Sequence, residues 1–224
     1  MLNDEEFAEW HTRLDLSQEA VDIIRRIRTS PPNRSVESRV GNVTVRFPSD
    51  KMGCVIQGES HTMELAFIYE REYDDDTFEF YDQPQPALYL DYQSKTGRRL
   101  CHPHTADFFT LGRTVAMTGW VECKPEEQLG KLTERNPNRY CRGDGGRWIC
   151  PPGERYAAQW GLAYRVYSSD DINWTLQRNL RFLADYYRKD CPPVSVEVIN
   201  AVLPVVKATP GITLASLLDY FTEE

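Results

Sequence analysis

The sequence predicts an α/β domain whose core runs helix, three strands, helix, strand, with a helical segment before it and a small helical tail after it. Two observations carry this prediction. Apolar residues recur at helical spacing in several segments, and three consecutive runs rich in strand-forming residues are separated by turn signals. The 224 residues are enough for one well-cored domain with an appendage.

The first predicted helix lies near the N-terminus. Its apolar residues share a helical spacing: Leu16, Ala20, Ile23, Ile24 and Ile27. Asp15 or Ser17 can cap its start, and Pro31 and Pro32 follow its end. A short alternating stretch then predicts a strand through Val43, Val45 and Phe47. We therefore expect residues 1–57 to form a helical and strand extension.

The predicted core begins with a helix that carries Glu64 near its start, because Met63, Phe67 and Glu70 or Arg71 follow a helical period. Three strand-forming runs come next, at residues 87–92, 105–110 and 115–124. Turn signals at residues 95–98 and 111–113 separate them, so they are expected to form an antiparallel meander.

The second half of the core is predicted from residues that typically begin helices or interrupt regular structure. Pro125, Glu126 and Glu127 are typical of a helix start, and residues 136–152 are typical of a long irregular loop. A helix at 154–160 and a strand at 162–167 should follow. A further helix ends at Pro192 and Pro193, so we expect the core domain to comprise residues 58–191. Amphipathic segments at 196–206 and 213–221 predict a helical region at 192–224, which could be part of a winged helix.

The composition argues against strong independent binding to nucleic acid. There are 34 acidic and 26 basic residues, for a net charge of −8, so any DNA contact needs local basic patches. The candidates are arginines grouped in the sequence: Arg25, Arg26 and Arg28; Arg98 and Arg99; and Arg135, Arg139, Arg142 and Arg147. Scattered cysteines, no signal peptide and no membrane-length apolar run predict a cytoplasmic protein without a membrane partner. A zinc site at Cys141 and Cys150 stays open.

The candidate chemistry lies where the third strand-forming run ends. Alternate residues of a strand share a face, so Glu122 and Lys124 should point the same way, and Asp107 on the neighbouring strand should come within reach. Two close carboxylates repel each other, and a divalent cation relieves that repulsion. Asp107, Glu122 and the main-chain carbonyl of Cys123 suit Mg²⁺, and Glu64 could supply another oxygen.

Lys124 could orient or help deprotonate an attacking water and stabilise charge on a phosphate. Other polar and aromatic residues stay outside the predicted site. His61, His102 and His104 are more often structural, and Trp120, Trp148, Trp160 and Trp174 are more often buried.

At these residues the sequence resembles the TnsA-like endonuclease subunits of heteromeric transposases, within the PD-(D/E)xK restriction-endonuclease-like superfamily. The resembling motifs are Ser60-His-Thr-Met-Glu64, Tyr81-Asp-Gln-Pro84, Thr105-Ala-Asp-Phe108 in place of Pro-Asp-Phe, and Val121-Glu-Cys-Lys124 in place of Glu-Val-Lys. They span roughly residues 58 to 190. Ala106 replaces the usual proline, which should matter little.

The resemblance implies that Glu64, Asp107 and Glu122 ligate one or two Mg²⁺ ions, with Mn²⁺ as a substitute, and that Lys124 is the catalytic lysine. It also implies cleavage of the 5′ strands of double-stranded DNA at transposon ends, beside a TnsB-like DDE transposase and a TnsC-like AAA+ ATPase that docks on the C-terminal region. Two alternatives stay open. One is a stand-alone restriction or repair nuclease, and the other is a non-catalytic assembly module.

Overall fold

The structure is a computed structural model that describes residues 1–34, 44–188 and 190–222. It is a mixed α/β protein with several small sheets. The chain divides into two units, Met1–Ala184 and Asp185–Glu224, and each is described by itself. The second unit therefore begins before Pro192 and Pro193, and the first includes the N-terminal segment as well as the expected core.

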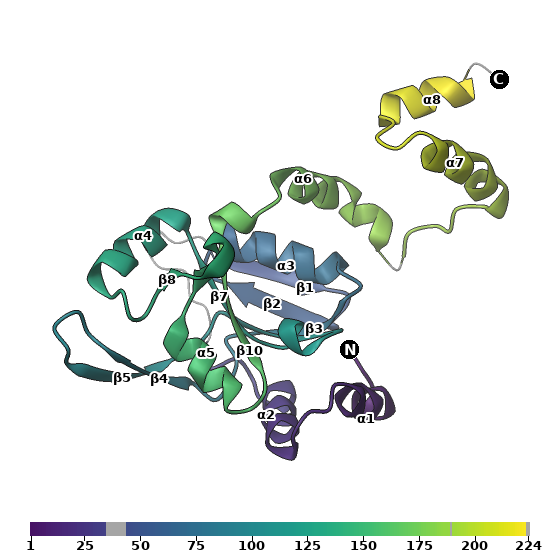
Figure 1. Cartoon of the computed structure of the whole chain (residues 1–224). Helices are drawn as coiled ribbons and strands as arrows, with labels where there is room; N and C mark the ends of the chain where they lie inside the picture. The colour runs from purple at the N-terminus through teal and green to yellow at the C-terminus, as the bar shows by residue number, and fades with distance from the viewer. Residues whose placement is uncertain (35–43, 189, 223–224) are drawn as a thin grey trace. The chain divides into compact units, whose positions relative to one another are not determined.

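A four-stranded sheet forms the centre of the first unit (Figure 1). Its strands lie in the order β10 (Ala163–Ser168), β7 (Gly119–Lys124), β6 (Phe108–Gly112) and β3 (Thr77–Asp82). β3 pairs antiparallel with β6, and β6 pairs antiparallel with β7, whereas β10 runs parallel to β7. The parallel pair requires a crossover connection, which residues 125–162 supply.

The first strand of the antiparallel meander was predicted in the wrong place. Residues 87–92 lie in β4 (Leu88–Gln93), which pairs with β5 (Arg99–His104) in a separate hairpin inserted between β3 and β6. β3 was not predicted, because the charged Glu79 interrupts its apolar pattern. In the structure Glu79 is fully buried. The third run also starts late, because Val115–Met117 forms a short 3₁₀ turn, η1, before β7.

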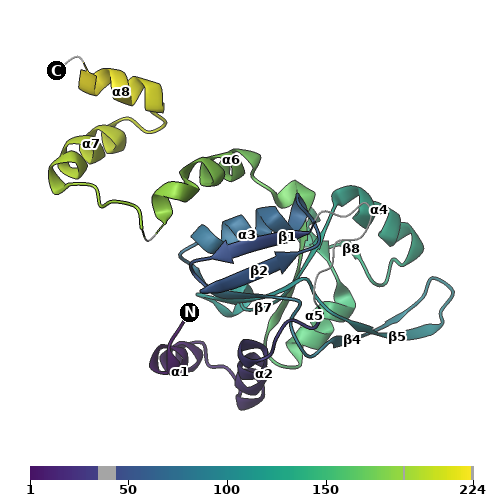
Figure 2. The ribbon, with the colours of Figure 1, turned by 180° about the vertical axis from the view of Figure 1, so that it is seen from behind.

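Helices cover both faces of the central sheet. α3 (Met63–Tyr73) lies on one face together with the hairpin of β1 (Val45–Ser49) and β2 (Cys54–Gly58). Figures 1 and 2 both show α3 above the sheet and α5 (Pro151–Ala158) and α2 (Gln18–Thr29) below it. The start of α3 is set locally, because the Ser60 hydroxyl accepts a hydrogen bond from the Met63 N–H at 3.1 Å.

The sheet consequently separates two apolar cores. The α3-side core includes Met63, Ala66, Phe67, Phe108, Val121 and Cys123. The α5-side core includes Trp10, Ile24, Phe109, Trp120, Tyr140, Ala157 and Tyr164. Successive residues of β7 alternate between the two cores, as strand geometry requires.

The N-terminal helices are part of the α5-side core. Ser17 caps α2 by accepting from the Ala20 N–H, as predicted, and α1 (Asp4–Arg13), which was not predicted, packs beside it. The Trp10 indole donates to the Gly112 carbonyl at 2.8 Å. Arg28 and the buried Glu79 form an ion pair at 2.9 Å. Residues 1–34 therefore help to hold the sheet, and Val43 lies outside the described residues.

The remaining elements of the first unit lie after β7. Pro125 precedes α4 (Glu126–Arg135), as the predicted helix start required. The predicted irregular loop contains two-residue strands, β8 (Cys141–Arg142) and β9 (Trp148–Ile149), around the turn η2 (Asp144–Gly146). The predicted last strand is confirmed as β10. The turn η3 (Ser169–Asp171) and α6 (Trp174–Leu183) complete the first unit, and the turn η4 (Ala184–Tyr187) begins at its last residue and continues into the second.

The second unit holds two helices, α7 (Val196–Ala208) and α8 (Leu214–Thr222), at the predicted positions. None of its described residues is buried. Several large apolar side chains are exposed, among them Val196, Ile199, Leu203, Leu214 and Leu218. None of the helices in the described ranges is both long and apolar enough to cross a membrane.

Candidate functional site

Asp107 is held where β6 and β7 lie side by side. It directly precedes β6, and the antiparallel register pairs Phe108 with Val121. The main-chain N–H of Cys123 donates to Asp107 Oδ2 at 2.7 Å. This hydrogen bond ties the carboxylate to the end of β7, so the structure brings Asp107 to the strand that carries the predicted Glu-x-Lys pair.

Lys124 joins the two carboxylates that the sequence placed near it. Its Nζ lies 2.8 Å from Glu122 Oε1 and 3.6 Å from Asp107 Oδ2. Nζ also lies 3.4 Å from the main-chain oxygen of Cys123. The predicted shared face of Glu122 and Lys124 is confirmed by this contact.

Glu64 approaches the same place from the first turn of α3. It is buried, and its Oε2 accepts a hydrogen bond from the Glu59 N–H at 2.8 Å. The chain can pass this close because residue 58 is glycine, since a Cβ there would lie 3.2 Å from Glu64 Oε2. Glu64, Asp107, Cys123 and Lys124 all line one cavity of about 650 Å³.

Glu122 does not line that cavity. The other residues that line it are Arg34, Glu59, Ser60, Met63, Pro103, His104, Thr105, Pro125 and Gln128. Glu122 is 1 % exposed and points into the α5-side core, beside Tyr140 and Tyr164. The structure thus gathers three of the four predicted side chains around the cavity and places the fourth behind them.

Three residues that the sequence analysis did not assign to the site surround Glu122. The Tyr140 hydroxyl donates to Oε1 at 3.0 Å, and the Tyr164 hydroxyl donates to Oε2 at 2.5 Å. His104 Nε2 lies 2.5 Å from the same Oε2. His104 had been set aside as structural, and the one sequence signal for its proximity was its position three residues before Asp107.

Burial and charge shift the acidities of these groups in opposite directions. Burial, reinforced by the charge of Asp107, raises the pKa of Glu64 to about 8. Burial also raises the pKa of Asp107, against the effect of Lys124. Burial alone would raise the pKa of Glu122, but Lys124 and His104 outweigh it and hold that pKa well below its usual range.

The ammonium group of Lys124 offsets the negative charge of these carboxyl groups. Burial works against its charge, but Glu122 and Asp107 overcome that effect and raise the pKa of Lys124. The ammonium group is therefore retained throughout the physiological range. This direction opposes the predicted help in deprotonating water, because a lysine that holds its proton is a poor base.

The donor set suits a hard divalent cation in part. Among the described residues, no group of three or more His, Cys, Asp or Glu side chains is arranged to hold a metal ion. This includes the surroundings of Cys141 and Cys150, which are both free thiols. Glu64 and Asp107 nevertheless face one cavity and disfavour each other's charge. Two carboxylates with a main-chain oxygen fit Mg²⁺, which keeps several waters.

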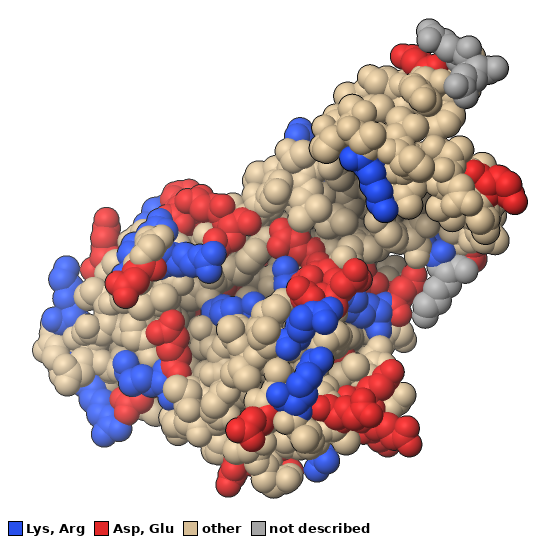
Figure 3. Space-filling view, turned by 45° about the vertical axis from the view of Figure 1, so that its right-hand side comes forward, with Lys and Arg blue, Asp and Glu red and all other residues tan. Residues whose placement is uncertain are grey.

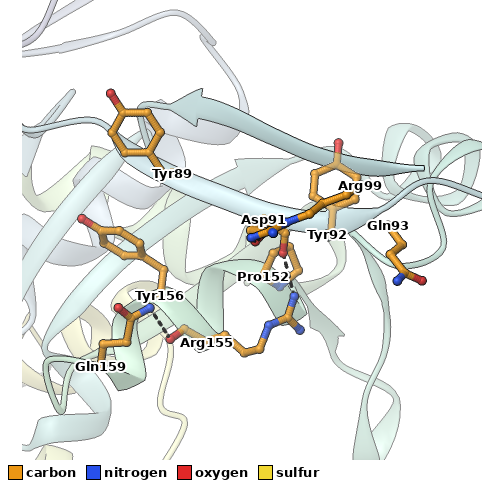
Figure 4. Close-up of a pocket in the computed structure, with 9 residues that line it drawn as sticks. All are labelled: Tyr89, Asp91, Tyr92, Gln93, Arg99, Pro152, Arg155, Tyr156 and Gln159. Atoms are coloured by element: carbon orange, nitrogen blue, oxygen red, sulfur yellow. Dashed lines mark hydrogen bonds and ion pairs between the residues drawn. The ribbon is translucent and has the colours of Figure 1, made fainter. Parts of the chain in front are cut away.

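A second cavity, of about 410 Å³, lies between β4 and α5 (Figure 4). Tyr89 and Tyr156 line one end of it, and Arg155 donates to the main-chain oxygen of Asp91 at 2.8 Å. Asp91 is the one carboxylate among the described residues that line this cavity, and it is paired with Arg99. The second cavity therefore lacks the paired carboxylates of the first.

Neither the comparison with protein-family models nor that with curated proteins gives a match to this chain.

Proposed function

We propose that this chain is a metal-dependent DNA endonuclease of the restriction-endonuclease-like class, and that it acts as the TnsA-like subunit of a heteromeric transposase. The observation that carries the proposal is the meeting of Glu64, Asp107 and Lys124 around one cavity at the ends of β6 and β7. Paired carboxylates beside a lysine that stays protonated are suited to hydrolysis of a phosphodiester.

The arrangement of the first unit supports the proposed class. A helix precedes an antiparallel meander, and a strand parallel to the last meander strand follows a helical crossover. The sequence predicted these types of element in this order, but it placed the first meander strand at residues 87–92, which belong to the separate hairpin of β4 and β5. Glu64 comes from the helix, Asp107 from the start of the second sheet strand in chain order, and Lys124 from the end of the third.

The residues divide the chemistry between them. Glu64, Asp107 and the main-chain carbonyl of Cys123 would hold Mg²⁺ or Mn²⁺, one ion or two. When bound, such a cation lowers the pKa of water and polarises a phosphate oxygen. Lys124 contributes positive charge against the negative charge that develops on the scissile phosphate, and its raised pKa keeps that charge in place.

The charge distribution favours an enzyme that reaches its DNA substrate with the help of partner proteins rather than alone. On the face drawn in Figure 3, basic and acidic side chains are interspersed. Four of the arginines predicted to meet DNA are already ion-paired: Arg25 with Asp22, Arg28 with Glu79, Arg99 with Asp91 and Arg142 with Glu126. A net charge of −8 further weakens independent binding to phosphates. We therefore propose a TnsB-like DDE transposase as the partner on the transposon end.

The second unit supplies a surface for the proposed ATPase. α7 and α8 expose Val196, Ile199, Leu203, Leu214 and Leu218. Exposed apolar groups of this kind mark protein interaction sites. The proposed partner is a TnsC-like AAA+ ATPase.

The test is strand nicking by the full-length protein with Mn²⁺ or Mg²⁺, on DNA that carries a transposon end and is assembled with the partner transposase. We expect Asp107→Ala to abolish nicking, because it removes one carboxylate of the cavity. Asp91→Asn is the matched control, since Asp91 lines the other cavity, and it should nick like the wild type.

Three outcomes separate the candidate functions. Nicking by Asp107→Ala at the wild-type rate would refute the proposed site. Cleavage of naked DNA by the isolated wild-type chain would favour a stand-alone restriction or repair nuclease. If the wild type binds neither Mg²⁺ nor Mn²⁺ and does not nick, the chain is a non-catalytic assembly module.

A further inference from the structure

We propose that Glu122 is not a metal ligand but a positioning residue, which fixes the ammonium group of Lys124 beside Asp107. His104, Tyr140 and Tyr164 hold Glu122 in that role. The inference rests on the proposed function and deepens it. Of the three predicted carboxylates, it assigns Glu64 and Asp107 to the metal ion and leaves Glu122 as a residue that does not bind metal.

The hydrogen-bonding capacity of Glu122 is already used. Oε1 lies 3.0 Å from the Tyr140 hydroxyl and 2.8 Å from Lys124 Nζ. Oε2 lies 2.5 Å from both the Tyr164 hydroxyl and His104 Nε2. A carboxylate offers about four lone-pair sites, so four donors leave none for a cation.

The direction of the side chain supports the same assignment. Glu122 shares a face of β7 with Trp120 and points into the α5-side core. Glu64 comes from α3, which packs on the opposite face of the sheet. Asp107 lies at the edge between them, which explains why the cavity is lined by Glu64 and Asp107 and not by Glu122.

Rotating the Glu122 side chain toward the cavity would take away the acceptor that the buried tyrosine hydroxyls now use. Tyr140 and Tyr164 are buried, and the Tyr164 hydroxyl also lies 3.1 Å from His104 Nε2, whereas the hydrogen bonds of the described residues give the Tyr140 hydroxyl no acceptor besides Glu122. Buried donors without acceptors are strongly disfavoured. The group therefore resists the rotation that metal ligation by Glu122 would need.

A further contact orients the ring of His104. Its Nδ1 lies 3.5 Å from Arg139 Nη2, which suits a ring that accepts at Nδ1 and donates from Nε2 to Glu122. His104 also lines the cavity. The imidazole thus contacts Glu122 and also lines the cavity, which Glu122 does not.

The first experiment measures Mn²⁺ binding to the full-length protein by calorimetry, which does not depend on nicking. Glu122→Gln and Asp107→Asn each remove one negative charge, so their difference isolates direct ligation from long-range attraction. We expect Asp107→Asn to weaken binding at least about tenfold more than Glu122→Gln does. Equal losses in the two variants would overturn the assignment.

Tyr140→Phe and Tyr164→Phe test the same point without removing the carboxylate, which matters if Glu122→Gln does not fold. Each removes one donor that competes for Glu122. If Glu122 were a ligand, freeing it would tighten Mn²⁺ binding. We expect the dissociation constant to change by less than about threefold in both variants, and a larger tightening would overturn the inference.

The positioning role has its own spectroscopic readout. In protein labelled with ¹⁵N-lysine, the Lys124 ammonium group should give a protected ¹H–¹⁵N signal, because it is buried against Glu122. We expect Glu122→Gln to shift or remove that signal and Glu64→Gln to retain it. An unchanged signal in folded Glu122→Gln would contradict the positioning role.

The outcomes distinguish this inference from the proposed function. Failure of the wild type to bind Mn²⁺ would overturn the metal-dependent function and this assignment with it. Binding by the wild type together with equal losses in Glu122→Gln and Asp107→Asn would overturn this assignment alone.

Discussion

Replacing Glu64 by glutamine should stabilise the protein, and the gain should grow with pH. The carboxyl group of Glu64 is buried beside Asp107, and its pKa is raised to about 8 from an ordinary value of 4.5. The folded protein therefore binds this proton more tightly than the unfolded chain does. Between these two pKa values the free energy of unfolding falls as pH rises, because ionisation is favoured only after unfolding.

The size of the effect follows from the two pKa values. Each pH unit in the window changes the free energy of unfolding by about 1.4 kcal/mol. Glutamine has nearly the same shape and no charge, so Glu64→Gln should match the wild type near the lower end of the window. The variant should exceed the wild type by about 3 kcal/mol at pH 7 and about 4 kcal/mol at pH 8.

The assay is chemical unfolding at a series of pH values in the presence of a chelator, so that no divalent cation compensates the carboxylates. Tryptophan fluorescence suits it, since all five tryptophans lie in the Met1–Ala184 unit. Gly130→Ala is the control, because it changes no ionisable group and should shift stability equally at every pH. A difference between Glu64→Gln and wild type that is constant from pH 5 to 8 would refute the argument.

Four further predictions concern the same unit. Mn²⁺ affinity should rise about tenfold per pH unit between about pH 6 and 8, because Glu64 must release its proton to bind, and a flat calorimetric profile would count against this. Gly153→Ala would place a Cβ 2.7 Å from the Tyr164 ring and should lower stability by about 1–3 kcal/mol in unfolding assays. Gly130→Ala in α4 meets nothing within 4 Å and should raise stability by about 0.5–1 kcal/mol. Gly119 has φ of +147°, and a Cβ there would lie 1.9 Å from a carbonyl oxygen of β10, so Gly119→Ala should reduce stability by about 3 kcal/mol or more; a thermal midpoint near the wild type would disprove this.

The parts of the site that depend on local geometry could be predicted from the sequence. Strand alternation alone places Glu122 and Lys124 on one face, and helical spacing places Glu64 in the first turn of α3. The antiparallel hairpin of β6 and β7 then brings Asp107 to Lys124. Each of these relations involves neighbours along the chain or across a short turn.

The surroundings of Glu122 could not be predicted in the same way. Tyr140 and Tyr164 lie 18 and 42 residues after it, and nothing in their local sequence marks them as its partners. β4, the first strand of the inserted hairpin, was mistaken for part of the central sheet because it has the stronger strand pattern, and β5, which ends at His104, was not predicted. Tertiary packing, rather than local propensity, decides these positions.

The parallel pairing of β10 with β7 also has a consequence for how the protein is made. Tyr164 reaches Glu122 only after the crossover has been synthesised and β10 has joined the sheet. A nascent or partly unfolded chain that lacks this strand leaves Glu122 without the hydrogen bond that the Tyr164 hydroxyl donates. We therefore expect the complete set of contacts around Glu122 to form only together with the finished sheet, so that under the proposed function incomplete chains would lack the full site.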